Sequence, residues 1–291
     1  LTTGSNNVAV GDNSLKNSNG SFNVAVGANA YQQGTGGSNV IVGGDAMSKY
    51  SGNNNVVMGT QAMYYGSGSN NVAIGTNTNY NGTNSETTYE GTTAVGHNAQ
   101  ARSLNSTAIG RETIAGTAGS NDYFANAVAV GYKANATGAY AVSIGENSNA
   151  TAFGGTALGR MANSTSDNAV AINGTAAGFA SVAMGIGSSS SGSSSVAIGN
   201  GASSTNQSAI AIGSSARAAG SESIAIGSNT NANGYRNTAI GTNACRFVNG
   251  SNKTCIGANS GPDSSDTWSS DSTERVFIGS RSKFNGGVAV L

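Results

Sequence analysis

The sequence is poor in the residues on which most enzymes and nucleic-acid-binding proteins depend. Its 291 residues include one proline, one histidine and two cysteines, and only 9% of them are charged. Because 13 basic residues balance 13 acidic ones, the chain lacks the basic excess that binds phosphate backbones or anionic membranes. A single histidine disfavours histidine-based catalysis. We therefore expect no enzymatic activity, no cofactor, no metal site and no nucleic-acid partner.

Long apolar runs and a network of disulfides are missing as well. No run approaches the about 18 apolar residues that a membrane span needs, so we expect no direct membrane insertion of this segment. Cys245 and Cys255 do not have a Cys-x-x-Cys metal spacing. They bracket a short loop that an oxidising compartment would close with a disulfide. The alternative is that Cys255 is a buried free thiol in a column of small residues.

What the chain has in abundance is one short repeat, punctuated by many of its 44 glycines. A motif such as Asn-Val-Ala-Val-Gly or Ser-Val-Ala-Ile-Gly recurs along the whole sequence, and we call its last residue the anchor and each repeat a rung. The one anchor that is not glycine is Asn173, and asparagine is the residue that best replaces glycine in the left-handed backbone region. The anchors are therefore expected to have positive φ and to mark tight turns. They are Gly11, Gly27, Gly43, Gly59, Gly75, Gly96, Gly110, Gly131, Gly145, Gly159, Asn173, Gly185, Gly199, Gly213, Gly227, Gly241, Gly257 and Gly279.

The columns of residues around the anchors predict strands. The residue just before the anchor is always large and apolar, the residue three before it is Val, Ile or Thr, and the residue between them is mostly Ala. Such alternation predicts a strand, and small residues three and often five positions after the anchor predict a second strand. A 14-residue rung then holds two strands of about five residues and two short turns.

These rungs predict an all-β fold, a parallel β-roll or β-solenoid of about 18 rungs of 14 to 16 residues, without useful helix. We interpret the chain as a single repeat domain over 1–291. Its parts are 16-residue rungs in 1–75, rungs with long insertions in 76–131, regular 14-residue rungs in 132–241 and irregular rungs in 242–291.

The large apolar column is the expected contact between subunits. Small residues suit a narrow lumen between two close sheets, which leaves the Ile and Val side chains pointing outward, where another subunit must cover them. In the alternative, the large residues fill the lumen and the Ala column faces outward. The first strand is apolar on both faces either way, so oligomerisation is expected in both cases. The expected contact residues are Ile74, Ile144, Ile198, Ile212, Ile226 and Ile240.

Residues 195–241, which begin SVAIGNGASSTNQSAIAIG, resemble the head repeat of trimeric autotransporter adhesins of the YadA type. The resemblance implies a left-handed parallel β-roll, a homotrimer and a position outside the cell. The 16-residue rungs, with NNVAVGDNSL at 6–15 and GSNNVAIGTN at 68–77, look more like repeats in tail fibres of bacteriophages and large viruses. The sequence is thus compatible with a bacterial cell surface or a virion fibre.

Three insertions interrupt the rungs and carry the candidate binding residues. Solenoids tolerate extra residues where they loop outward, often on the functional face. Aromatic rings beside carboxylates and amides suit sugars or protein loops, although the same rings also suit packing down onto the roll. The candidates are Tyr80 and Tyr89 in 76–91, Tyr123 and Phe124 in 115–126, and Trp268 in 261–275.

Together these features predict a non-enzymatic, trimeric extracellular fibre that presents binding loops to a receptor, glycan or protein, on a host or cell surface. Two alternatives stay open. The first is a tailspike-like enzyme that degrades polysaccharide, because paired carboxylates can hydrolyse glycosidic bonds. The second is a purely structural spacer within a fibre.

Overall fold

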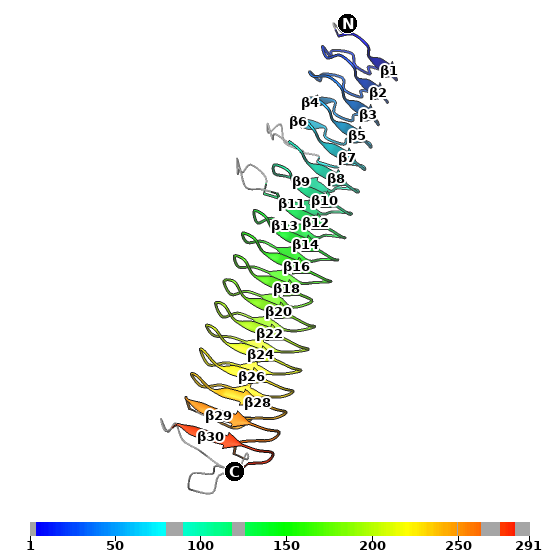
Figure 1. Cartoon of the computed structure of the whole chain (residues 1–291). Coiled ribbons are helices and arrows are strands. Elements are labelled where there is room, and N and C mark those ends of the chain that lie inside the picture. Colours follow the sequence, from blue (N-terminus) through cyan, green and yellow to red (C-terminus); the bar gives the residue numbers. More distant parts are fainter. Residues whose placement is uncertain (1–3, 80–89, 118–125, 249, 263–273, 283–291) are drawn as a thin grey trace. The chain divides into compact units, whose positions relative to one another are not determined.

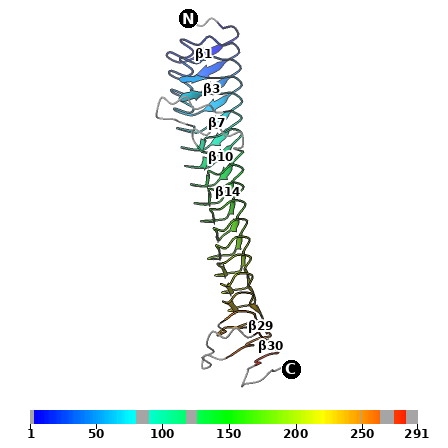
Figure 2. The same ribbon diagram turned by 90° about the vertical axis from the view of Figure 1, so that its left-hand side faces the viewer.

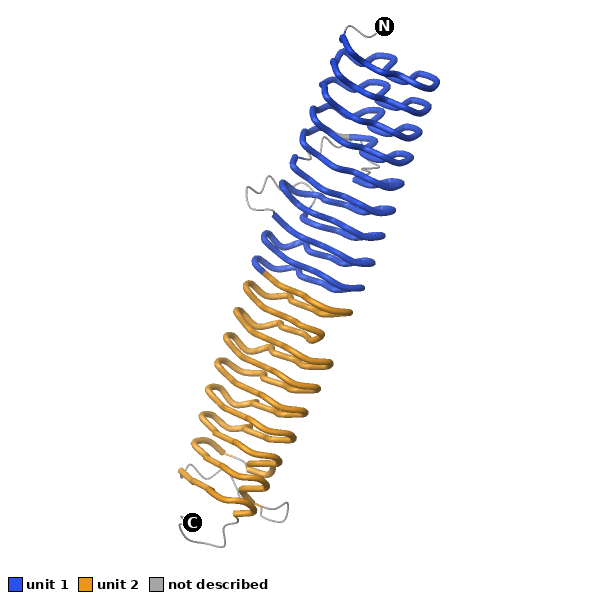
Figure 3. The backbone as a smooth tube through the Cα atoms, turned by 45° about the vertical axis from the view of Figure 1, so that its right-hand side comes forward, with its two compact units in different colours: residues 1–154 blue, residues 155–291 orange. Residues whose placement is uncertain are grey.

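The structure is a computed structural model that describes residues 4–79, 90–117, 126–248, 250–262 and 274–282. It contains two compact units, residues 1–154 and residues 155–291 (Figure 3). Every regular element of the described residues is a β-strand, and none of these residues is helical. Each unit is a parallel β-solenoid, as the repeat predicted; the single domain over 1–291 stays a prediction.

The first sheet of unit 1 contains one strand from each rung, stacked in the order of the sequence (Figures 1 and 2). Neighbouring strands pair in parallel and in the same register, so that Ala9 lies opposite Ala25 and Ala108 opposite Ala129. Its strands are β1 (Val8–Val10), β2 (Val24–Val26), β3 (Val40–Val42), β5 (Val56–Met58), β7 (Val72–Ile74), β8 (Thr93–Val95), β10 (Thr107–Ile109), β12 (Val128–Val130) and β14 (Val142–Ile144).

Unit 2 repeats this arrangement, with Ala211 opposite Ala197 and Ala225. The strands of its first sheet are β16 (Thr156–Leu158), β18 (Val170–Ile172), β20 (Val182–Met184), β22 (Val196–Ile198), β24 (Ile210–Ile212), β26 (Ile224–Ile226), β28 (Thr238–Ile240), β29 (Lys253–Ile256) and β30 (Arg275–Ile278).

The second strand of a rung contains only two residues where it forms, which is shorter than predicted. In unit 1 these strands are β9 (Gln100–Ala101), β11 (Ile114–Ala115), β13 (Asn135–Ala136) and β15 (Asn149–Ala150). In unit 2 they are β17 (Asn163–Ser164), β19 (Thr175–Ala176), β21 (Ser189–Ser190), β23 (Ser203–Ser204), β25 (Arg217–Ala218) and β27 (Asn231–Ala232). The first strands are also short, because the anchor after each of them turns the chain.

The anchors have the backbone conformation that the sequence predicted. Gly213 has a φ of 131°, and a Cβ there would lie 2.5 Å from the carbonyl oxygen of Gly227, the next anchor. Asn173 takes a φ of 51°, in the left-handed region that asparagine tolerates. The anchor column thus requires both a positive φ and a missing side chain, which explains why it is so nearly all glycine.

The 16-residue rungs of 1–75 contradict the prediction of a second strand in every rung. After their anchors the chain forms turns, and the fourth residue adopts a left-handed conformation that places a large side chain in the core. Leu15, Tyr31, Met47 and Met63 have φ between 46° and 55° and are at most 1% exposed. Two further three-residue strands, β4 (Lys49–Ser51) and β6 (Tyr65–Ser67), form a small parallel pair beside these turns.

A ladder of asparagines, buried except for the half-buried first one, runs through the same rungs and was not predicted. It stands four residues before each anchor and consists of Asn7, Asn23, Asn39, Asn55 and Asn71. The Oδ1 atom of each asparagine accepts a hydrogen bond from the backbone N–H of the next, at 2.8 to 3.0 Å. The amide groups of the first four also donate to glycine carbonyls, at 2.8 to 3.2 Å. The ladder satisfies polar backbone groups that face the core.

Candidate functional site

The apolar face, as we call it, consists of the side chains one and three residues before each anchor. Within each unit they project from the outer side of the first sheet, because side chains alternate along a strand and the residue between them is buried. Ala73 and Ala225, for example, are fully buried between exposed or half-buried neighbours. The residue between the two outward side chains faces the lumen and is mostly alanine, so the alternative with Ala outside is wrong.

The six isoleucines predicted as subunit contacts all lie on this face. Ile74, Ile144, Ile226 and Ile240 are between 36% and 41% exposed. Ile198 and Ile212 are half-buried. Rows of large apolar side chains left in water exceed what monomeric proteins usually expose, so the arrangement suits contact with another apolar surface.

The five aromatic residues predicted to bind a ligand lie outside the described residues. They are Tyr80, Tyr89, Tyr123, Phe124 and Trp268. Glu90 and Glu274, which lie near the C-terminal ends of the insertions 76–91 and 261–275, are described and are exposed.

Other exposed aromatic residues, which the sequence analysis missed, stand on the turns of regular rungs. The rings of Tyr140 and Phe153 meet edge to face, with centroids 5.5 Å apart. Phe179 is 55% exposed in unit 2. All three stand five or six residues before an anchor, at the turn that precedes the first strand. The signal that could have found these aromatic residues is the column five or six positions before each anchor, where they recur in the sequence.

The turns after the anchors of unit 1 carry a cluster of charged and aromatic residues. Arg111 and Lys133 flank the ring of Tyr132, with the charged groups 5.6 and 5.2 Å from its centroid. Both cations also pair with Glu112, at 2.9 and 3.5 Å. The hydrogen bond with Tyr132 and the electrostatic interactions with Tyr132 and Glu112 raise the pKa of Lys133. The cluster is exposed, so it contributes little to stability.

Unit 2 has a similar pairing on its second set of turns. Arg236 Nε donates a hydrogen bond to Glu222 Oε2 at 2.8 Å, and Tyr235 donates to Glu222 Oε1 at 3.3 Å. The hydrogen bond from Arg236 holds the pKa of Glu222 below its usual value. These residues lie one above the other on successive rungs, since 13 or 14 residues separate them.

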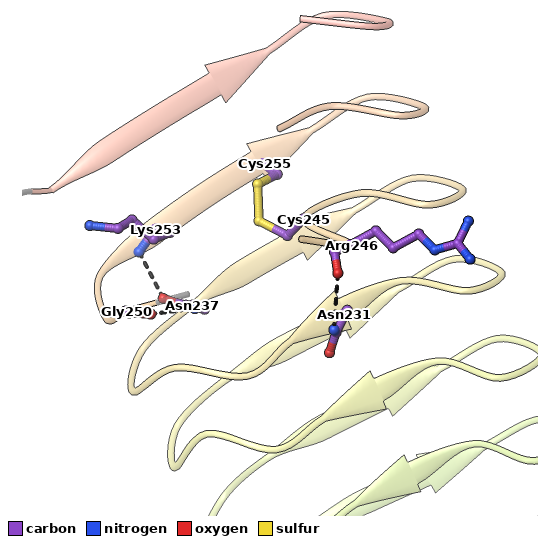
Figure 4. Close-up of a disulfide and its surroundings, with 7 residues drawn as sticks. All are labelled: Asn231, Asn237, Cys245, Arg246, Gly250, Lys253 and Cys255. Atoms are coloured by element: carbon purple, nitrogen blue, oxygen red, sulfur yellow. Dashed lines mark hydrogen bonds between the residues drawn. A yellow bond between two sulfur atoms is a disulfide. The ribbon is translucent and has the colours of Figure 1, made fainter. Parts of the chain in front are cut away.

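The structure joins Cys245 and Cys255 in a disulfide across the lumen (Figure 4). Their Cα atoms are 5.6 Å apart, and both side chains are fully buried. Cys245 has a φ of 51° and occupies the position that Leu15 and Met47 hold in the other 16-residue rungs. Cys255 stands in the small-residue column, so the bond links the two walls of one rung.

The surroundings of the disulfide repeat features of the N-terminal rungs. Asn237 Oδ1 accepts a hydrogen bond from the backbone N–H of Lys253 at 2.9 Å, and its amide group donates to Gly250 O at 2.9 Å (Figure 4). These two hydrogen bonds are the same as those of the asparagine ladder in the N-terminal 16-residue rungs, but here one asparagine makes them.

Neither a metal centre nor a membrane helix is found in the part of the chain that the structure describes. No group of three or more His, Cys, Asp or Glu side chains there is arranged to hold a metal ion. The same residues form no helix of the length and apolarity that crossing a membrane requires.

Comparison with known proteins finds one family. The family model described as the YadA head domain repeat matches residues 90–113, 125–148, 150–172, 176–202, 204–230 and 218–244. The search of curated proteins finds no match. The matched segments begin after the asparagine ladder and follow the rungs that have two strands.

Proposed function

The repeats within residues 90–244 belong to the YadA head domain family, and on this premise we propose that the chain is a segment of a trimeric, extracellular adhesin fibre. YadA-family adhesins are homotrimers whose heads are exposed on the bacterial outer membrane, and their head domains are generally structural modules without enzymatic activity. In this proposal the strands are the scaffold, and turns and insertions present binding groups to a host or cell surface.

The apolar face is the observation that carries the proposal. Its Val, Ile, Leu and Met side chains recur at every rung of each unit, while the lumen behind them is already filled, with alanine in most rungs and with larger side chains such as Tyr31 and Met47 in the 16-residue rungs. Burying one such side chain completely contributes about 1.5 to 3 kcal/mol. The side chains are only partly buried in the single chain, so association of subunits through this face recovers the remainder from many rungs at once.

The oligomeric state tests the proposal directly. The unmodified chain should run as a trimer by light scattering, and the pair Ile212→Asp with Ile226→Asp should dissociate it, because buried unpaired carboxylates cost several kcal/mol each. Arg217→Asp changes charge on the exposed second strand and is the matched control, which should remain trimeric. A stable trimer in the double variant would refute the proposed contact.

Attachment is tested separately from assembly. We propose that the insertions 76–91 and 115–126, with Tyr80, Tyr89, Tyr123 and Phe124, bind the target surface in three copies and gain avidity from that repetition. Shortening both to plain turns should abolish attachment while leaving the trimer and its melting temperature nearly unchanged. Undiminished attachment would refute this assignment and move the search to the segment that contains Trp268.

A further inference from the structure

One rung of unit 2 is two residues shorter than its neighbours. The anchors Asn173 and Gly185 are 12 residues apart, whereas the flanking spacings are 14. The second strand of this rung, β19, pairs Thr175 with Asn163 of the preceding rung and with Ser189 of the following rung. This register identifies which residues are missing. They are the two that follow the anchor and form the tip of the turn, which we call the anchor turn.

The deletion leaves a slot between the anchor turns of the rungs on either side. The structure has a cavity of about 490 Å³ there, with Met161 on one flank and Ile186 on the other. These two side chains are 63% and 73% exposed, the largest exposed fractions among the large apolar residues that the structure describes. The flanking turns are about 9.6 Å apart, twice the spacing between neighbouring strands. The slot is therefore one strand thick.

In regular rungs the anchor turns stack through one peptide group each. Its N–H donates to the carbonyl of the preceding turn, and its carbonyl accepts from the following one. Unit 2 shows this from Gly201 to Ile186 O at 3.0 Å, from Ser215 to Asn200 O at 2.8 Å and from Asn229 to Ser214 O at 2.9 Å. Within each unit the stack is continuous wherever the described rungs have their full length.

The short rung removes one peptide group from this stack. By register, the missing carbonyl would accept from the N–H of Gly187, and the missing N–H would donate to the carbonyl of Arg160. Within the described residues, neither of these two backbone groups makes a hydrogen bond. By register, the slot thus presents a free donor and a free acceptor on opposite walls, the two partners of one missing peptide group.

A buried hydroxyl on the slot wall is also without a partner. Ser188 is 2% exposed and lines the cavity, and its Oγ atom makes no hydrogen bond in the described part of the chain. Ser148 and Thr230 occupy the same position in other rungs, where they donate to the carbonyl of their anchor. A Cβ on Gly174 would lie 2.1 Å from Ser188 Oγ, so the glycine keeps this part of the wall open.

We propose that the slot binds the acetamido group of an N-acetylated sugar. The amide of such a group accepts from Gly187 N–H and donates to Arg160 O, restoring the interrupted stack. Its methyl group lies between Met161 and Ile186, while the sugar ring stays at the open mouth beside the guanidinium of Arg160.

The number of free groups favours a sugar over a peptide chain. Two backbone groups next to the slot are already bonded: Asn173 N–H donates to Leu158 O, and Gly174 O accepts from Asn163 N–H, both at 2.9 Å. The gap in the stack between Arg160 O and Gly187 N–H holds a single amide, and further peptide groups of a bound chain would lie outside this gap. A sugar carries one isolated amide together with hydroxyls that remain in water.

This inference deepens the proposed attachment function and rests on it for its biological meaning. The sugar is measured on the purified chain, whereas attachment is measured on surfaces, so failure of one is distinguishable from failure of the other. Ligand-observed NMR with N-acetylglucosamine should detect binding. Glucose and glucosamine, which lack the acetamido group, should bind at least about tenfold more weakly, as expected for two lost hydrogen bonds.

Filling the slot is the decisive variant. Insertion of Ser and Asn between Asn173 and Gly174 copies the Ser228–Asn229 anchor turn and completes the stack, so the variant should remain folded and lose sugar binding. The same dipeptide inserted between Gly213 and Ser214 enlarges a full-length turn and is the control, which should keep binding. Undiminished binding after the first insertion, or equal binding of glucose, would overturn the proposal. Tighter binding of N-acetylglycine N-methylamide than of N-acetylglucosamine would also overturn it and identify a peptide site.

Discussion

The 16-residue rungs of residues 4–79 and the 14-residue rungs that follow Gly96 solve the same packing problem in different ways. In the longer rungs, large side chains enter the core from left-handed turns, and buried asparagines satisfy the backbone. In the shorter rungs a two-residue second strand places alanine or serine in the core, and polar ladders lie on the surface. Two extra residues per rung therefore replace a strand with a turn and widen the lumen.

The largest expected difference lies in the core volume. Met47 is fully buried in a 16-residue rung, so Met47→Ala should leave a cavity and cost about 2 to 5 kcal/mol of unfolding free energy. The reciprocal change, Ala218→Met, forces a large side chain into a 14-residue rung and should cost about 1 to 3 kcal/mol through overpacking. Guanidinium unfolding followed by circular dichroism measures both. If Ala218→Met proved neutral, the lumen of the shorter rungs would be wider than the structure indicates.

The asparagine ladder provides the next test. The amide of Asn39 donates to Gly52 O at 2.8 Å and to Tyr31 Oη at 3.2 Å, and its Oδ1 accepts from the N–H of Asn55 at 2.9 Å. Asn39→Ala leaves several of these groups without partners in the core, and each unpaired group costs about 1 to 3 kcal/mol of unfolding free energy. We expect a loss of about 2 to 4 kcal/mol in the same unfolding experiment.

Ser223 stands at the equivalent position of a 14-residue rung and is the matched control. Its hydroxyl donates one hydrogen bond, to Gly220 O at 2.6 Å, so Ser223→Ala should cost only about 1 kcal/mol. Equal losses in the two variants would mean that the ladder does not distinguish the two kinds of rung.

The disulfide lies in the one 16-residue rung among the later rungs and sharpens the comparison further. Oxidised chains should show no free thiol after denaturation, and reduction should lower the unfolding free energy by about 2 to 3 kcal/mol through release of the closed loop. Cys245→Leu with Cys255→Ala reproduces the pair Leu15 and Ala25, so it should recover packing but not the loop restriction. Two free thiols in unreduced chains would exclude the bond.

The sequence predicted the parts of the fold that repeat, because a column of eighteen residues averages out local exceptions. The anchors, the buried Ala225 and the outward Ile226 follow directly from alternation along a strand. The left-handed backbone conformation of Tyr31 did not follow from the sequence, since bulky residues rarely adopt positive φ. The rung length alone does not reveal that a turn replaces the second strand. Likewise, the 12-residue spacing after Asn173 was visible, but the broken hydrogen-bond stack depends on register in three dimensions.

The smallest expected difference is in pH dependence. The buried ladder of the longer rungs is neutral, whereas the surface pair of Glu222 and Arg236 in the shorter rungs titrates. The hydrogen bond from Arg236 lowers the pKa of Glu222 in the folded chain, so its small contribution to stability is present above the pKa of an unfolded glutamate, about 4.3, and disappears as the pH falls through the lower folded value. An NMR titration of the Glu222 carboxyl should therefore show a midpoint below that of an ordinary glutamate. Arg236→Gln should return the midpoint toward the ordinary value, with little change in unfolding free energy because the pair is exposed. An unchanged midpoint in this variant would show that the pair does not persist in solution.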